Sequence, residues 1–181
     1  MKKISTFQIV NFIFWTALVL LNWFYFKPVI QNKYLDSDII AFKDVSWKYS
    51  IVVFLLILVF LVGYFYKVDK EKLNVRNIGL LILLALFISF LLKTFTDNFM
   101  LYINTKIDYK NTTIAYKVIE NKENKVFELY DNKSFISHDD ELNKINKYRI
   151  DTKSKSLFEY KNNDTIHVSF NRGIIGVNFI K

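Results

Sequence analysis

Two long segments without charged residues occupy the first half of the chain, at residues 7–26 and 49–66. At a rise of about 1.5 Å per residue, helices of this length match the roughly 30 Å hydrocarbon core of a bilayer. Lys2 and Lys3 precede the first segment, as in a secretory signal peptide, but its length and aromatic end favour an uncleaved signal anchor. We expect both segments to be membrane-spanning helices.

A third apolar run covers residues 78–92 and is shorter than the other two. Apolar neighbours lengthen it on both sides, so we predict a third span over residues 75–95. Beyond it, Lys93 and Asp97 have the i,i+4 spacing of a helical ion pair, with apolar residues between and after them. This pattern indicates an amphipathic stalk, and the alternative is a frayed loop at the membrane interface.

The distribution of Lys and Arg predicts the orientation of these spans. Residues 1–6 carry two cations and residues 67–76 carry four, whereas four are spread over residues 27–48 together with three Asp. Short cytoplasmic segments are the ones enriched in Lys and Arg. We therefore expect the cytoplasmic (inner) membrane, with the N-terminus cytoplasmic and the C-terminus periplasmic or extracellular.

Beyond the stalk, apolar and polar residues alternate with the period of a β-strand. This alternation predicts a hairpin from residues 112–120 and 125–131, then short strands at 133–137, 155–161, 166–170 and 173–180. Residues 138–149 form a helical pattern, with Ser137 three residues before Asp140 as in a capping box. The prediction is an antiparallel sheet of five or six strands with one helix.

The expected fold class is thus a membrane α-helical anchor with a small C-terminal antiparallel β-rich (α+β) extracytoplasmic domain. We assign residues 1–104 to the anchor with its stalk and residues 105–181 to the domain. The expected core residues of the domain are Val168, Phe170, Ile175, Val177 and Phe179. Because so small a core without disulfides is only marginally stable, we expect it to pack on the loop of residues 27–48 or on another subunit.

Composition removes several classes of function. The 181 residues include no Cys, which excludes a disulfide scaffold, a thiolate metal site and a Cys nucleophile. The net charge of +8 lies mostly in residues 1–92, which hold ten Lys or Arg against five Asp or Glu. This concentration favours contact with a charged membrane surface over nucleic-acid binding.

Candidate chemistry in the domain is sparse. Residues 138–141, His-Asp-Asp-Glu, are the one compact group of potential metal ligands, but acids in a first helical turn are also favoured by the helix dipole. His167 alternates with apolar neighbours and is expected to be an exposed strand residue. With no triad, nucleophile elbow or phosphate loop in the sequence, we expect no catalytic, cofactor or metal site and no enzyme.

Polar residues in the first span suggest a helix-association face. Asn11, Trp15, Leu18 and Asn22 have i, i+4, i+7 and i+11 spacing and share one side of the helix. This side either packs against the other two spans or recruits another membrane protein. We name Asn11, Trp15 and Asn22 as helix-association residues.

The leading hypothesis for function is a non-enzymatic accessory or protective, immunity-like subunit. It would display its β-rich domain to an extracytoplasmic or membrane protein partner, with the lipid bilayer as its other contact. The alternative is a subunit of an oligomeric channel or transporter, with a homo-oligomer as one form of it, assembled through the face that carries Asn11 and Asn22.

Overall fold

The computed structural model describes residues 6–68, 74–121, 126–131 and 135–180. The chain forms two compact units, described separately below. The helical unit consists of Met1–Phe26 and Phe42–Met100, and the sheet unit consists of Lys27–Ala41 and Leu101–Lys181. The sheet unit therefore includes most of the segment that joins the first two apolar runs.

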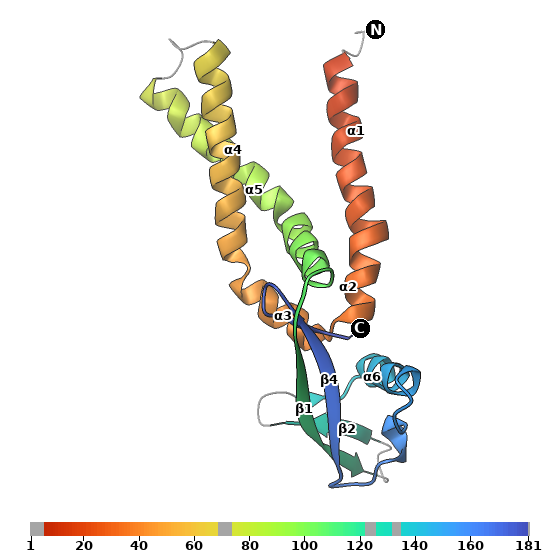
Figure 1. The fold of residues 1–181 in the computed structure, drawn as a ribbon. Helices are drawn as coiled ribbons and strands as arrows, with labels where there is room; N and C mark the ends of the chain where they lie inside the picture. Colours follow the sequence, from red (N-terminus) through yellow and green to blue (C-terminus); the bar gives the residue numbers. More distant parts are fainter. Residues whose placement is uncertain (1–5, 69–73, 122–125, 132–134, 181) are drawn as a thin grey trace. The chain divides into compact units, whose positions relative to one another are not determined.

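Helices account for nearly all of the described first half of the chain (Figure 1). Helix α1 (Thr6–Leu21) continues through a π-helical turn (Asn22–Phe26) into α2 (Lys27–Lys33) and is followed by α3 (Asp36–Val45). Helices α4 (Trp47–Val68) and α5 (Val75–Asn104) complete the set. Within the described residues, three helices are long and apolar enough to cross a membrane, namely Gln8–Lys33, Trp47–Val68 and Val75–Asn104.

Helix α5 runs without interruption from the third apolar run to Asn104. The segment after that run is therefore helical, and Lys93 and Asp97 form the i,i+4 ion pair that their spacing predicts.

The sheet unit contains a curled antiparallel sheet of five strands in the order β3-β2-β1-β4-β5 (Figure 1). Strand β1 (Asp108–Asn121) lies at its centre and pairs with both β2 (Val126–Tyr130) and β4 (Thr165–Gly173). The outer strands β3 (Phe135–Ile136) and β5 (Asn178–Phe179) are short. The tip of the predicted β1–β2 hairpin, residues 122–125, lies outside the described residues.

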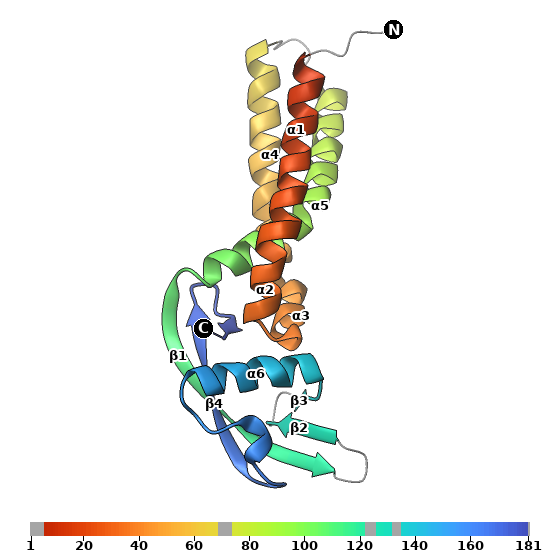
Figure 2. The same ribbon diagram turned by 90° about the vertical axis from the view of Figure 1, so that its right-hand side faces the viewer.

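Helix α6 (Asp139–Asp151) and a short 3-10 helix (Leu157–Glu159) cover one face of this sheet (Figure 2). Alternate residues of β4 are buried, as its pattern predicts, because one face of the strand meets the helix and the other does not. The buried core joins the sheet, α6 and one residue from the loop before α3: Leu35, Tyr116, Val118, Leu129, Ile136, Leu142, Ile145, Leu157, Ile166, Val168, Phe170 and Ile180.

Three local predictions were wrong. Residues 155–161 contain the 3-10 helix instead of a strand. Residues 174–177 form a turn with Gly176 at a φ of +82°, so the predicted last strand is reduced to β5. The residue that caps α6 is His138, not Ser137, and its side chain makes no capping hydrogen bond.

Candidate functional site

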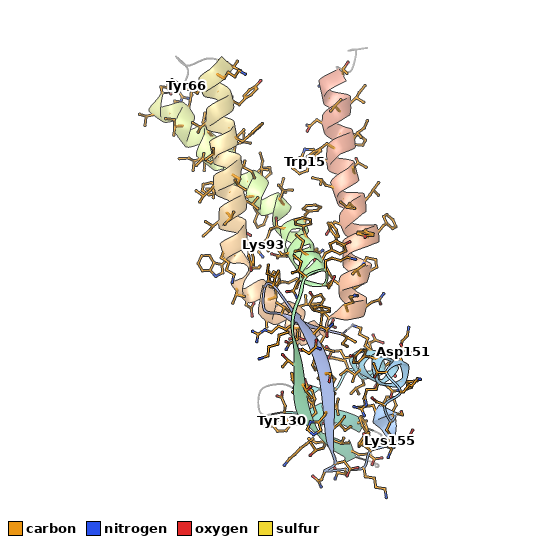
Figure 3. The ribbon with its side chains drawn as sticks, in the orientation of Figure 1. Trp15, Tyr66, Lys93, Tyr130, Asp151 and Lys155 are labelled. Carbon is orange, nitrogen blue, oxygen red and sulfur yellow. The ribbon has the colours of Figure 1, made fainter. Side chains whose placement is uncertain are left out.

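The helix-association residues lie in different surroundings along α1. The Asn98 side-chain amide donates a hydrogen bond to Asn22 Oδ1 at 2.8 Å, which links the end of the first span to α5. One turn further, the Phe26 ring contacts the ring of Phe95 at 5.7 Å. Trp15 is half-buried, whereas Asn11 is exposed (Figure 3). The structure therefore brings Asn22, but not Asn11, to a polar partner within the described chain.

A second polar group surrounds Lys93 in the helical unit. Its ammonium group lies 2.8 Å from Asp97 Oδ2 and donates to Ser46 Oγ at 3.1 Å. The Asp97 side chain is only 4% exposed, and its other oxygen has no hydrogen-bond partner among the described residues. The hydrogen bond from Lys93 to Ser46 thus links α5 to the residue just before α4.

The polar side chain of Asn104 is fully buried at the end of α5 and connects three other parts of the sheet unit. Its amide nitrogen donates to Tyr34 Oη and to the carbonyl of Val177, both at 2.9 Å, and its oxygen accepts from the N–H of Ile175 at 3.0 Å. The Tyr34 hydroxyl in turn donates to the carbonyl of Leu101 at 2.8 Å. We call these five residues the Asn104 cluster.

The Asn104 cluster is closely packed and electrically neutral. Burial raises the pKa of the Tyr34 hydroxyl far above its ordinary value, although the hydrogen bond from Asn104 acts in the opposite direction, so the hydroxyl stays protonated and donates. A Cβ atom at Gly173 would overlap the backbone carbonyl of Asn104, so only glycine fits there. Sequence reasoning missed this cluster because its members are separated by about 70 residues of chain and carry no recognisable motif.

Residues 27–41, between the first two candidate spans, form part of the sheet unit and contact the rest of it at several further points. Ile180 donates its N–H to the carbonyl of Lys33 at 2.7 Å, and the Lys144 ammonium donates to the carbonyl of Tyr34 at 3.3 Å. Leu35 lies in the hydrophobic core. These contacts confirm the expectation that the small core packs on this loop, because part of the loop completes it.

One residue of the acidic group at the start of α6 forms a hydrogen bond with the start of α3. Buried Glu141 accepts the N–H of Asp36 at 2.6 Å and so satisfies a free donor at the first turn of α3. Burial, together with the charge of Glu141, raises the pKa of nearby Asp38 to about 6. His138, Asp139 and Asp140 remain exposed. No group of three or more potential metal ligands occurs among the described residues.

Arg149 holds the end of α6 against β4. Its guanidinium donates to the carbonyls of Lys155 at 3.0 Å and His167 at 2.8 Å, and to the Tyr160 hydroxyl at 3.0 Å. It also lies over the Tyr160 ring, 5.3 Å from the centroid. Each nitrogen of the buried guanidinium therefore has an acceptor, which gives Arg149 a structural role.

The sheet face opposite α6 is open within the described part of the unit. Ile119, Tyr130 and Phe135 lie on neighbouring strands of this face and are 39%, 44% and 49% exposed (Figure 3 labels Tyr130). His167 is exposed on the same face, as its pattern predicts. Beside them lies an open hollow of about 700 Å³, lined by Thr112, Thr113, Ile114, Ala115, Lys117, Tyr130, Asp131, Thr165 and Asn178.

The residues named as the domain core differ in burial. Val168, Phe170 and Phe179 are each 1% exposed and pack inside the sheet unit. Ile175 and Val177 are half-buried, and both contribute backbone groups to the Asn104 cluster.

Comparison of the chain with protein-family models, with curated proteins and with solved structures found no match. The functional argument therefore rests on the geometry described above.

Proposed function

We propose that this protein is anchored in the cytoplasmic membrane by three spans and displays its sheet unit outside the cytoplasm. There it acts as a non-enzymatic accessory or protective, immunity-like subunit on an extracytoplasmic or membrane protein. Large apolar side chains support the anchor, because Phe12, Phe60 and Phe90 are 72%, 72% and 75% exposed on the three long helices. Exposed apolar area on this scale is stable only when lipid or another protein covers it.

The observation that carries this proposal is the composition of the sheet unit. In a protein with three spans, the loop between the first two spans and the C-terminal segment lie on the same side of the membrane. Residues 27–41 and 101–181 belong to one compact unit, joined by the Asn104 cluster and by the hydrogen bond that the Asp36 N–H donates to Glu141. The contacts of the folded chain thus support three spans independently of hydropathy.

The direction of insertion rests on charge. The N-terminal segment and the loop after the second span are denser in Lys and Arg than the loop after the first, which favours their retention in the cytoplasm. The sheet unit then faces the periplasm or the outside of the cell. Its open face, with three exposed apolar side chains beside a polar hollow, has the mixed character of a protein-binding surface.

The test is complementation of a host deletion strain with a chain that ends at Asn104. This variant keeps all three candidate spans and lacks the sheet. We expect loss of function, with the full chain expressed at a matched level as the control. Full activity of the shortened chain would contradict the proposal.

The alternative, a subunit of an oligomeric channel or transporter, is favoured by exposed Asn11 on α1. A polar side chain on a lipid-facing helix surface is expensive unless another helix supplies a hydrogen bond. Measurement of the particle mass in nanodiscs tests this alternative. A ring of several copies that Asn11→Leu disperses would support it, and a monomer would not.

A further inference from the structure

Strand β1 has one unpaired edge over half of its length. On one side it pairs with β4 from Asp108 to Lys117, and on the other it pairs with β2 only from Lys117 to Asn121. Between Lys110 and Tyr116 no strand of the described chain occupies the second side, as Figure 2 shows for the upper half of β1. An unpaired edge of this length is a template for another strand.

The backbone groups on this edge can be identified from the ladder. Val118 donates its N–H to the carbonyl of Asp164 at 2.9 Å and accepts from the N–H of Asn163 at 2.8 Å, so both of its groups point toward the β4 side. Because this direction alternates along a strand, Asn111, Thr113 and Ala115 point their N–H and C=O groups toward the open side. No backbone hydrogen bond to them from outside their own ladder occurs within the described residues.

The other edges of the sheet are less available. Strands β3 and β5 have two residues each. The free side of β4 is engaged at its centre, where Arg149 donates to the carbonyl of His167. Natural sheets protect their edges by short strands and by such covering contacts. Among the described strands, β1 keeps the longest unprotected edge.

The surroundings of this edge fit an extended chain. Strand β2 ends at Tyr130, opposite Lys117, and the hollow begins at this point and continues past Ala115 to Thr112. A new strand placed here would continue the line of β2 along β1. Alternate side chains of that strand would point to the open face, next to exposed Tyr130 and Phe135.

Charge decides what kind of strand fits. The segment Lys110–Lys117 carries a cation at each end and contains no Asp or Glu. The one acidic residue in the lining of the hollow, Asp131, lies at the Lys117 end and already has an interaction of its own. A second copy of β1 paired here would add two further lysines and no acid to this edge, so the charges of the two strands would not offset each other. A strand that carries Asp or Glu near its ends gains from both lysines.

We propose that the sheet unit binds its partner by strand addition: an extended, acidic segment of the partner pairs with Asn111, Thr113 and Ala115 of β1. This inference rests on the proposed function and specifies the mode of binding. Main-chain hydrogen bonds supply the attachment, the lysines select acidic segments, and the Tyr130 side of the hollow receives apolar side chains.

The test uses the full chain in nanodiscs and a blocked synthetic peptide, Glu-Val-Thr-Val-Thr-Val-Thr-Glu, as the probe, because its two Glu residues have the seven-residue spacing of Lys110 and Lys117. Hydrogen exchange measured by mass spectrometry should slow in the fragment that contains residues 110–117 when the peptide is added. A matched peptide with Lys in place of Glu should bind roughly threefold to tenfold more weakly. Absence of binding, protection of another segment, or equal binding of both peptides would overturn the inference.

Ala115→Pro is the sharpest variant, because it removes an N–H that points away from the β4 ladder. Proline is tolerated at such edge positions. Ala115→Val is the control, since it keeps the N–H on the same strand. We expect Ala115→Pro to weaken peptide binding about tenfold while exchange in β4 stays unchanged, and Ala115→Val to bind as the native chain does.

If Ala115→Pro disturbs the fold, the double variant Lys110→Glu, Lys117→Glu tests the same edge without altering the backbone. It should reverse the preference and favour the Lys peptide. A dimer of the full chain that itself protects residues 110–117 would replace the acidic partner with a second copy and contradict the inference. Complementation by the chain ending at Asn104 tests the proposed function separately. Failure of the proposed function can therefore be distinguished from failure of the strand-addition inference.

Discussion

At the scale of single residues, Asn104 and Glu141 each connect parts of the chain that are far apart in sequence. Asn104 makes three hydrogen bonds inside the sheet unit, and Glu141 satisfies the first turn of another helix. A buried side chain that satisfies buried backbone groups contributes more by its presence than its net hydrogen-bond energy suggests, because its removal leaves those groups without partners.

The first prediction concerns Asn104→Ala. This change leaves the N–H of Ile175 and the carbonyl of Val177 without their partner, so the free energy of unfolding of the sheet unit should fall by about 2–4 kcal/mol. Pulse proteolysis in mild detergent measures this loss. Asn143→Ala, on the exposed side of α6, is the matched control and should change the stability little. An Asn104→Ala protein as resistant to proteolysis as the native chain would contradict the role of the cluster.

The second prediction concerns the half-buried carboxylate of Asp38, whose pKa is raised to about 6, against about 3.9 in an unfolded chain. Between these values the folded state binds more protons, so this group stabilises the fold fully below about pH 4, and the stabilisation is lost as the pH rises through 6. Asp38→Asn should therefore raise the free energy of unfolding at pH 7 by roughly 1–3 kcal/mol and flatten the slope between pH 4 and 6.

Chemical denaturation at a series of pH values checks this expectation. Asp151→Asn, an exposed change at the end of α6, controls for the general effect of removing a negative charge. If Asp38→Asn is less stable than the native chain at pH 7, or if the free energy of unfolding keeps the same slope between pH 4 and 6, then the ionised Asp38 carboxylate does not destabilise the fold and the prediction is wrong.

At the scale of elements, the contacts of α1 separate two interpretations of its polar face. Asn22 bonds to Asn98 of α5, whereas Asn11 is exposed. Association within the chain is thus observed at Asn22, whereas recruitment of another protein through Asn11 stays a prediction.

The third prediction follows from this division. Asn22→Leu should lower the stability of the helical unit by about 0.6–2 kcal/mol without affecting insertion, and adding Asn98→Leu should cost little more, because the two residues form one bond. Thermal unfolding in mild detergent measures both variants. Asn11→Leu is the matched control and should leave the unfolding temperature unchanged. The particle mass should change in this variant only if Asn11 binds another chain. Native stability of Asn22→Leu would mean that the polar face is merely tolerated.

At the scale of the whole molecule, the fourth prediction tests the topology through the natural absence of Cys. Single Cys residues at exposed Ser37 and Ser154 should both react with a membrane-impermeant maleimide in intact cells, or in cells with only the outer membrane permeabilised. Cys in place of Asn74, in the loop after the second span, should react only after lysis. Opposite labelling of Ser37→Cys and Ser154→Cys would exclude three spans, and labelling of Asn74→Cys from outside would reverse the orientation.

The sequence alone determined the elements with strong periodicity. Runs of charge-free residues as long as 49–66 have few stable forms other than a membrane helix, and α4 covers that run. The alternation of Ile166, Val168 and Phe170 likewise predicted β4, because a strand with one buried face imposes a period of two. The same rule failed at residues 174–177, where the left-handed conformation of Gly176 forms a turn.

Only the tertiary structure decided which distant segments meet. Tyr34, Asn104 and Val177 are ordinary polar or apolar residues in sequence, and they become a cluster because the fold places a loop, a helix end and a turn together. The open edge of β1 also depends on where β2 ends, which strand pairing fixes and local pattern does not. Periodicity reports the surroundings that one segment requires, whereas contacts between segments depend on how all of them pack.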